Sequence, residues 1–101
     1  MSLDHLRDSL QRRLEKAPPL GYVVDLDFGD EGHVYLDGSN NPNVVLDHIS
    51  VEPDTTLTLT PETMRKILDG DTDPNMAVLM GKLKISGKMG VALKLASYLE
   101  Q

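Results

Sequence analysis

Residues 80–95 read MGKLKISGKMGVALKL, and this stretch decides how the C-terminal part of the chain folds. Three interpretations compete for it: a phosphate-binding loop, a patch that touches membranes, and one wall of an apolar pocket. Residues 81–87 alternate apolar and polar side chains, with Leu83 and Ile85 on one side, which predicts a strand with one dry face. A helix that is apolar over most of its circumference is expected from about Lys88 to Leu99.

The spacing within this stretch excludes a phosphate-binding loop. That motif needs four residues between its two glycines, a lysine after the second glycine, and then a Ser or Thr that reaches magnesium. Five residues separate Gly81 from Gly87, and Met89 follows Lys88 where the hydroxyl is needed. We therefore assign these glycines and lysines to a strand and the start of a helix.

Other catalytic and metal-binding motifs are excluded because residues that they require are absent or wrongly spaced. Residues 69–80 begin like a calcium loop, but Pro74 replaces the glycine of its turn and Met80 replaces its bidentate glutamate. The three histidines are far apart in sequence, no serine has the surroundings of a nucleophile elbow, and the chain has no cysteine. Asp25 and Asp27 share one side of a strand, where we interpret them as solubilising. We expect no catalytic residue, no metal site and no cofactor.

Four further strands are expected upstream, at residues 21–29, 32–39, 43–51 and 54–60, where β-branched and aromatic runs are separated by turn compositions. The first three read as an antiparallel meander. Each strand should have one dry and one wet face. In the first strand the wet positions are Val23, Asp25 and Asp27, and in the fourth the dry positions are Leu57 and Leu59.

Three further helices are expected. Leucines at three- and four-residue steps predict an amphipathic helix over residues 2–16, with Ser2 as its candidate N-cap. Thr60 caps a second helix that has Pro61 at its first position and ends near Gly70. Asp73 and Pro74 start a short third helix. The resulting order, α-β-β-β-β-α-α-β-α, predicts an α+β domain with helices packed on one sheet face.

Length and composition narrow the class of protein. A chain of 101 residues with 40% apolar residues is expected to form one domain, over residues 1–101. The net charge of −6 and the few aromatic residues argue against nucleic acid as a partner. No cysteine, no signal-peptide pattern and no apolar run of membrane-spanning length occur, so we expect a cytoplasmic protein.

The positive charges are distributed unevenly. No Lys or Arg occurs between Ala17 and Met64, whereas four lysines crowd residues 82–94 and four cations accompany the leucines of the N-terminal helix. One hypothesis is that these cations and leucines make weak, transient contact with anionic membranes. The alternative is that the leucines cover the sheet and the cations are solvated.

Apart from the initiator, every methionine lies between Met64 and Met89. Methionine fills irregular space and adapts to variable partners because its side chain is unbranched and polarizable. Composition alone leaves two interpretations open, an ordinary core and an adaptable apolar pocket.

Residues 54–101, DTTLTLTPETMRKILDGDTDPNMAVLMGKLKISGKMGVALKLASYLEQ, resemble the C-terminal half of sterol carrier protein 2 (SCP2) domains. The shared pattern is a Thr/Leu strand, a helix ending before Gly, an Asp with Pro, a short helix, then Gly-Lys-Leu-Lys-Ile-x-Gly and Met-Gly before an apolar helix. The segment GKLKISGKMG at 81–90 is the most specific part. The chain is thus similar to small, stand-alone, bacterial-type members of that family.

The resemblance implies a five-stranded, mostly antiparallel sheet covered by helices on one face. It also implies an apolar tunnel between sheet and helices that holds fatty acids, fatty acyl-CoA or sterol-like lipids for transfer or presentation, without catalysis. On this view Gly81 turns the chain from helix to strand, Gly87 ends the strand, and Gly90 permits a close approach at the last helix. The alternative function is an accessory domain with a filled core that docks an enzyme or complex of lipid metabolism.

The expected lipid-binding side chains lie on the apolar faces of this C-terminal half. They are Met64, Ile67, Leu68, Met76, Leu79, Met80, Leu83, Ile85, Met89, Leu93 and Ala96.

Overall fold

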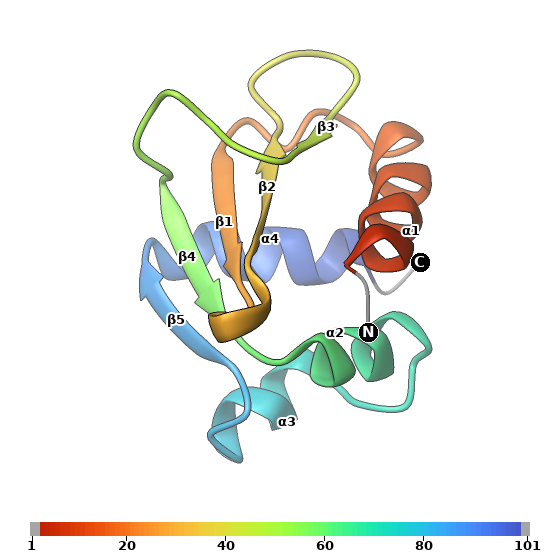
Figure 1. Ribbon diagram of the computed structural model, residues 1–101, viewed down its shortest axis with the longest axis vertical. Helices are drawn as coiled ribbons and strands as arrows, with labels where there is room; N and C mark the ends of the chain where they lie inside the picture. Colours follow the sequence, from red (N-terminus) through yellow and green to blue (C-terminus); the bar gives the residue numbers. More distant parts are fainter. Residues whose placement is uncertain (1–2, 100–101) are drawn as a thin grey trace.

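The computed structural model describes residues 3–99 and has five strands in one sheet, with helices against one of its faces (Figure 1). The elements, in chain order, are α1 (Asp4–Glu15), β1 (Val23–Asp27), the 3-10 helix η1 (Gly29–Glu31), β2 (His33–Asp37), β3 (Val44–Leu46), β4 (Thr55–Thr58), α2 (Pro61–Leu68), α3 (Pro74–Leu79), β5 (Lys84–Gly87) and α4 (Met89–Leu99). The predicted α+β class and element order are confirmed.

The sheet has the strand order β3-β2-β1-β4-β5. All neighbours are antiparallel except β1 and β4, which are parallel. The β1–β2–β3 meander extends to one side, so the chain returns across the sheet to place β4 at the free edge of β1. Leu26 of β1 lies opposite Val34 on one side and Leu57 on the other, and this register puts the three side chains on the same, buried face.

Two strand expectations need correction. The third strand was expected over 43–51 but spans only Val44–Leu46, because the chain then leaves the sheet edge. Val23, predicted on the wet face, is buried. The chain after β3 folds back over it: Val23 donates to the Asp54 carboxylate at 2.8 Å and accepts from the Asp54 backbone at 2.7 Å, so a loop covers the end of β1.

Helix α1 packs against β3 and α4, and its leucines Leu6, Leu10 and Leu14 are buried in the core. Ser2, the expected N-cap, lies outside the described residues. Two of the cations are held within the protein: Arg7 forms ion pairs with Asp4 and Asp47, and Arg13 hydrogen-bonds backbone carbonyls. The hypothesis that the α1 leucine stripe faces a membrane is therefore wrong, and the alternative, that it covers the sheet, is confirmed.

Asn43 fastens the end of α1 to the sheet. Its buried side-chain amide donates to the carbonyls of Leu14 at 2.8 Å and Pro18 at 3.0 Å, and its Oδ1 accepts from the Leu20 amide at 2.8 Å. A buried polar group is tolerated when its hydrogen-bonding atoms have partners, as here. The APP segment that ends α1 is thereby held in place.

Helix α4 lies behind the sheet, and helices α2 and α3 lie beyond one end of its strands (Figure 1). Helix α4 packs against β4 and β5, and α3 lies at one end of the molecule, opposite the loops that join β2, β3 and β4. Between residues 3 and 99, no helix has the length and apolar composition that crossing a bilayer requires.

Candidate functional site

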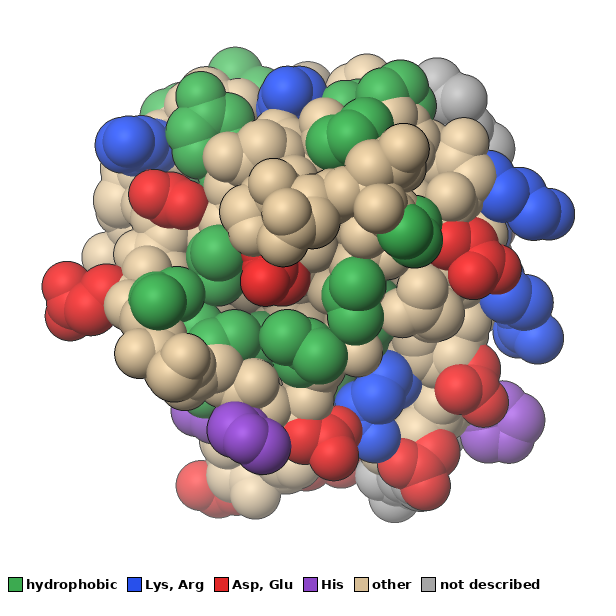
Figure 2. Space-filling view, turned by 90° about the horizontal axis from the view of Figure 1, so that it is seen from above, with side chains coloured by type: hydrophobic (Ala, Val, Ile, Leu, Met, Phe, Trp, Pro, Cys, Tyr) green, Lys and Arg blue, Asp and Glu red, His purple; other side chains and the backbone are tan. Residues whose placement is uncertain are grey.

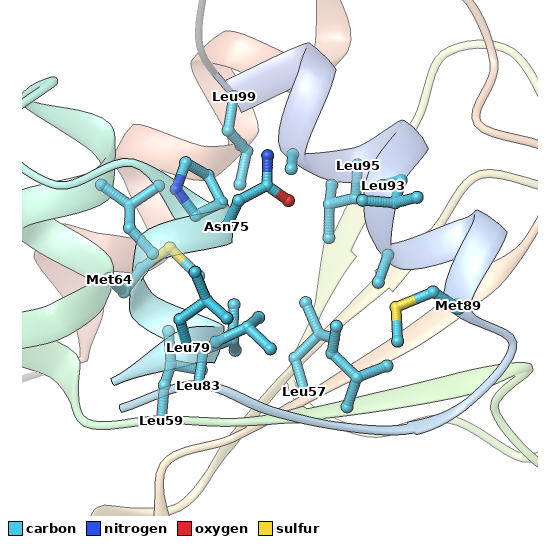
Figure 3. Close-up of a pocket in the computed structure, with 16 residues that line it drawn as sticks. Leu57, Leu59, Met64, Asn75, Leu79, Leu83, Met89, Leu93, Leu95 and Leu99 are labelled. Atoms are coloured by element: carbon cyan, nitrogen blue, oxygen red, sulfur yellow. The ribbon is translucent and has the colours of Figure 1, made fainter. Parts of the chain in front are cut away.

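An apolar cavity of about 360 Å³ lies between the β4–β5 half of the sheet and helices α2, α3 and α4 (Figure 3). Its lining residues are Leu57, Leu59, Met64, Ile67, Pro74, Asn75, Val78, Leu79, Leu83, Ile85, Met89, Ala92, Leu93, Leu95, Ala96 and Leu99. The volume falls within the range of small-molecule sites, about 300–1,000 Å³.

The strand side of the cavity follows from the two-residue period of β4 and β5. Leu57 pairs with Ile85 across the two strands, so both side chains project to the same face. Leu59 and Leu83 continue this wall beyond the ends of the strands. The predicted inward positions are thus confirmed, and Lys84, on the opposite face, is exposed.

Helix α2 supplies the deep part of the cavity. Its first turn is fixed as the sequence predicts: the Thr60 side chain accepts a hydrogen bond from the backbone of Thr63 at 3.1 Å, and Pro61 occupies the first helical position. This start orients Met64 and Ile67 into the cavity. The helix ends at Leu68, before Gly70 with its positive φ of 82°.

Helix α3 forms one side of the mouth. Asp73 caps it by accepting a hydrogen bond from the Asn75 backbone at 2.8 Å. Asn75 and Leu79, one helical turn apart, both line the cavity, and Ala77 faces the core. Gly81, with φ of 74°, then turns the chain toward β5, as expected, since only glycine adopts this backbone readily.

Helix α4 closes the remaining side with Met89, Ala92, Leu93 and Ala96 among the residues facing the cavity. Gly87 ends β5 as expected; a side chain there would collide with the backbone of Asp54 and Thr55. The expectation for Gly90 is wrong. Nothing lies within 4 Å of where its Cβ would be, so no close approach occurs at this position.

The mouth of the cavity opens to solvent. Leu79 is 80% exposed, and Met89 and Leu93 are also exposed, yet all three line the cavity. Figure 3 shows Leu79 and Met89 on different sides of the space, with Leu57 and Leu83 below them. A ligand that fills the cavity would therefore be buried at one end and reach solvent at this rim.

Eight of the eleven residues expected at the lipid site line the cavity. They are Met64, Ile67, Leu79, Leu83, Ile85, Met89, Leu93 and Ala96. The other three do not. Leu68 is buried in the core outside the cavity, and Met76 and Met80 are exposed on the outside of α3 and just beyond its end. Their apolar character alone did not reveal which side of the short helix faces the sheet.

Several lining residues were not expected at the site. The sequence could have indicated Leu57 and Leu59, because the alternation of their strand predicts that they face inward. It could also have indicated Ala92, Leu95 and Leu99, which belong to the helix predicted to be apolar. No sequence pattern indicated Asn75. Among the described lining residues it is the one with a polar side chain, and Figure 3 shows its amide beside the cavity.

The titratable groups closest to a catalytic arrangement lie on the opposite face of the sheet. His33 Nδ1 is 2.8 Å from Asp25 Oδ1, and its other ring nitrogen is 3.8 Å from Asp27. The hydrogen bond to Asp25 is the main cause that raises the pKa of His33. Tyr35 stacks on the His33 ring at 5.7 Å. None of these groups borders the cavity.

The described lining residues include no charged or nucleophilic side chain. Among residues 3–99, no group of three or more His, Cys, Asp or Glu side chains is arranged to hold a metal ion. A ligand in this cavity would make van der Waals contacts with leucine, isoleucine and methionine side chains. It would meet one carboxamide, that of Asn75, near the mouth.

Solved structures of known proteins share this fold. The sterol carrier protein domain 2 of Helicoverpa armigera superposes with a TM-score of 0.78 at 22% identity and covers 98% of this chain and 86% of its own. Palmitated SCP2L2 from Aedes aegypti superposes with a TM-score of 0.76 at 24% identity, covering 100% of this chain and 96% of its own. The five-stranded, mostly antiparallel SCP2-like fold is thus confirmed.

Sequence comparison extends the likeness to the family level. Hydroxysteroid dehydrogenase-like protein 2 of Homo sapiens is 34% identical over 97 residues, which is 95% of this chain but 23% of that protein. The chain therefore spans about a quarter of the length of the hydroxysteroid dehydrogenase-like relatives that it matches. The model of the SCP-2 sterol transfer family matches residues 3–100. The chain belongs to the SCP-2 sterol transfer family.

Proposed function

We propose that this protein binds lipids with a long apolar chain in the cavity between β4, β5 and the three helices, and that it transfers or presents them without catalysis. The observation that carries this proposal is an apolar cavity of about 360 Å³ whose described lining has one polar side chain. Fatty acids, fatty acyl-CoA and sterol-like molecules are the ligands of this chemistry. The palmitated Aedes aegypti structure, which shares the fold, supports an acyl chain among them.

The energetics of the cavity favour a bound ligand. An unfilled apolar cavity costs about 24 cal/mol per Å³, so 360 Å³ would cost about 9 kcal/mol if sealed and empty. The whole stability of a domain is only about 5–15 kcal/mol. A lipid that fills the space removes this cost, while water that enters through the mouth gains little from apolar walls.

Hydrocarbon burial is sufficient for affinity. Each buried methylene contributes about 0.8 kcal/mol, so about fourteen of them give roughly 11 kcal/mol before other terms. Association and ordering subtract several kcal/mol. The remainder, at most about 7 kcal/mol, corresponds to a Kd of about 10 μM or weaker without any ion pair in the cavity.

Asn75 supplies the polar end of the site. An apolar chain buried among Leu57, Leu83 and Leu95 leaves its polar head at the open rim, where the Asn75 amide can donate to a carboxylate or hydroxyl. We expect the ligand to bind with its head group at the mouth and its chain inside.

Two measurements test this function. Native mass spectrometry of the purified protein should show a co-purified lipid mass. Saturating palmitate should raise the melting temperature, because a ligand at one hundred times its Kd stabilises the folded form by about 2.7 kcal/mol. For a domain of this size that is about 10 °C or more. Bare protein whose transition neither palmitate nor palmitoyl-CoA moves would favour the alternative, an accessory domain that docks a lipid-metabolism enzyme.

A further inference from the structure

The polar end of the cavity has no positive charge of its own. The chain contains ten Lys and Arg residues, all within residues 3–99, and none of them lines the cavity. A carboxylate or phosphate that leaves water is costly unless a cation or several hydrogen-bond donors receive it. The described lining offers one polar group, the carboxamide of Asn75. The surroundings of Asn75 therefore decide which head groups the site favours.

The lysines that follow α3 in the sequence are directed elsewhere. Lys82 and Lys84 line a separate hollow that does not include Asn75. The ammonium groups of Lys88 and Lys94 lie over the ring of Tyr22, at 5.7 and 5.8 Å from its centre. None of the four is placed by these contacts to meet a head group beside Asn75.

One arginine is bound to an element of the cavity. Arg13 donates to the backbone carbonyls of Leu68 at 2.8 Å and Leu99 at 3.1 Å, and Leu99 lines the cavity. The Arg13 side chain itself does not border the cavity. Its terminal nitrogens are directed at these two helix ends, so we do not assign it to the head group.

Negative charge is fixed beside Asn75. The Asp73 carboxylate accepts a hydrogen bond from the Asn75 backbone at 2.8 Å. Asp69 and Asp71 precede it in the chain, and all three carboxylates are exposed. Within residues 3–99, no ion pair neutralises any of them. An anionic head group at this end of the cavity would meet like charge, in a chain whose net charge is already −6.

Hydrogen-bonding chemistry points the same way. A carboxamide such as that of Asn75 both donates and accepts, and so does a hydroxyl group, whereas a carboxylate only accepts. A hydroxyl can therefore pair with either polar atom of the amide. A carboxylate can use only its nitrogen and is repelled by its oxygen.

We propose that the cavity selects lipids with an uncharged, hydroxyl-bearing head group, such as long-chain alcohols and monoacylglycerols, over anionic lipids of the same chain length. Asn75 pairs with the hydroxyl, and the charge of Asp73 disfavours an anion. This preference rests on the proposed lipid-carrier function and names the ligand class within it. Fatty acids still bind through their hydrocarbon chains, but with a lower affinity.

The test compares dodecanol with dodecanoate at neutral pH, each displacing the uncharged dye N-phenyl-1-naphthylamine from the full chain. Their chains are the same length, so the contacts of the hydrocarbon cancel. We expect dodecanol to bind more tightly. Part of that difference comes from the hydration of the free ligands, so the quantity to compare between proteins is the ratio of the two Kd values.

Two isosteric variants change the charge beside the cavity in opposite directions. D73N removes a charge and keeps the helix cap, since Asn caps helices as well as Asp does. It should strengthen dodecanoate binding about threefold, the effect of one exposed charge pair. N75D adds a charge and should weaken dodecanoate binding about threefold. Dodecanol should bind both variants normally, because a hydroxyl can donate to a carboxylate, and high salt should reduce both effects.

The control is an acidic residue at the opposite end of the molecule. The loops joining β2, β3 and β4 lie there, far from α3 (Figure 1), and Figure 2 shows that end with acidic side chains spread among its apolar groups. Glu52, in the loop before β4, is exposed and does not line the cavity. E52Q changes the net charge by the same amount as D73N, so it should leave both Kd values unchanged.

Several outcomes would overturn the proposal. A ratio of Kd values that neither D73N nor N75D moves would show that these residues do not select the head group. An equal effect of E52Q would assign the preference to the net charge. A loss of dodecanoate binding in R13Q, with dodecanol binding intact, would show that Arg13 holds the carboxylate.

The preference and the carrier function can be told apart when they fail. Wild-type protein that binds neither dodecanol nor dodecanoate would refute the carrier function, and the preference with it. Wild-type protein that binds both, with a ratio of Kd values that the two variants leave unchanged, would refute the preference alone.

Discussion

Arg13 of α1 donates a hydrogen bond from Nη2 to the carbonyl of Leu68 at 2.8 Å, and from Nη1 to the carbonyl of Leu99 at 3.1 Å. These carbonyls end α2 and α4, two helices that line the cavity. The last carbonyls of a helix lack partners within it, and a cation there also interacts favourably with the helix dipole. A residue that the sequence placed among solvated cations thus joins three helices.

We expect Arg13→Ala to lower the free energy of unfolding by about 2 kcal/mol, because it leaves two partly buried carbonyls without a charged donor. Urea denaturation measures this change. Arg13→Lys should recover only part of the loss, since one ammonium cannot reproduce the two-pronged geometry of the guanidinium. Equal stability of the alanine variant and the wild type would show that water replaces these hydrogen bonds.

Filling the cavity from α4 should separate ligand binding from folding. Ala96→Phe places a ring in the space that Leu57 and Leu83 border, so we expect palmitate to lose its effect on the melting temperature. The unliganded protein should keep or gain stability, because the ring fills space that otherwise destabilises. Ser97→Phe, on the adjacent exposed position, is the matched control and should bind palmitate normally. Normal palmitate binding by both variants would place the ligand elsewhere.

Replacing the polar residue of the cavity should change which ligands bind. Asn75→Leu removes the amide beside the mouth, so palmitate should bind about fivefold more weakly, the effect of one lost hydrogen bond. A hydrocarbon of the same chain length should bind as well as before or better. Isothermal titration with both ligands gives the comparison. A parallel loss for both would mean that Asn75 shapes the helix and does not contact the head group.

The pair of His33 and Asp25 should make stability depend on pH. Hydrogen bonding to Asp25 raises the pKa of His33 in the folded protein above its value in the unfolded chain. The free energy of unfolding that protonated His33 gains from Asp25 is fully present below the pKa of the unfolded chain, near 6.5. It is lost as the pH rises through the pKa of His33 in the folded protein. We expect His33→Gln to lower the free energy of unfolding more at about pH 5 than at about pH 9.

Urea titrations of wild type and His33→Gln at both pH values test this expectation. The stacking of His33 on Tyr35 is lost equally at both, so it cancels in the comparison. A loss of the same size at pH 5 and pH 9 would show that the ion pair contributes nothing beyond this packing. Palmitate binding should be unaffected, since the pair lies on the sheet face away from the cavity.

Local signals in the sequence determined most of the framework. The Thr60–Pro61 start of α2 and the Asp73 cap of α3 were predicted because each depends on residues within one turn of the chain, and the turn at Gly81 was expected from the family resemblance. The alternation that placed Leu57 and Leu83 inward likewise depends only on the two-residue period of a strand. Eight residues of the cavity followed from such periods and from the family resemblance.

Contacts between distant segments decided the rest. Val23 is buried by a loop about thirty residues further along the chain, Asn43 completes its hydrogen bonds on the end of α1, and Arg13 reaches two helices beyond residue 60. No local pattern encodes these partners, since each requires elements to be docked first.

The cavity itself also depends on how distant elements dock against one another. Periodicity states which side of an element is apolar, but the distance between α4 and the sheet decides whether apolar sides meet in a filled core or enclose a space. On α3, apolar on several sides, packing of Ala77 into the core selected Leu79 for the cavity and left Met76 and Met80 in solvent. The sequence by itself determined the family and which apolar faces line the cavity. Only tertiary packing decided that these faces enclose a space and where that space opens to solvent.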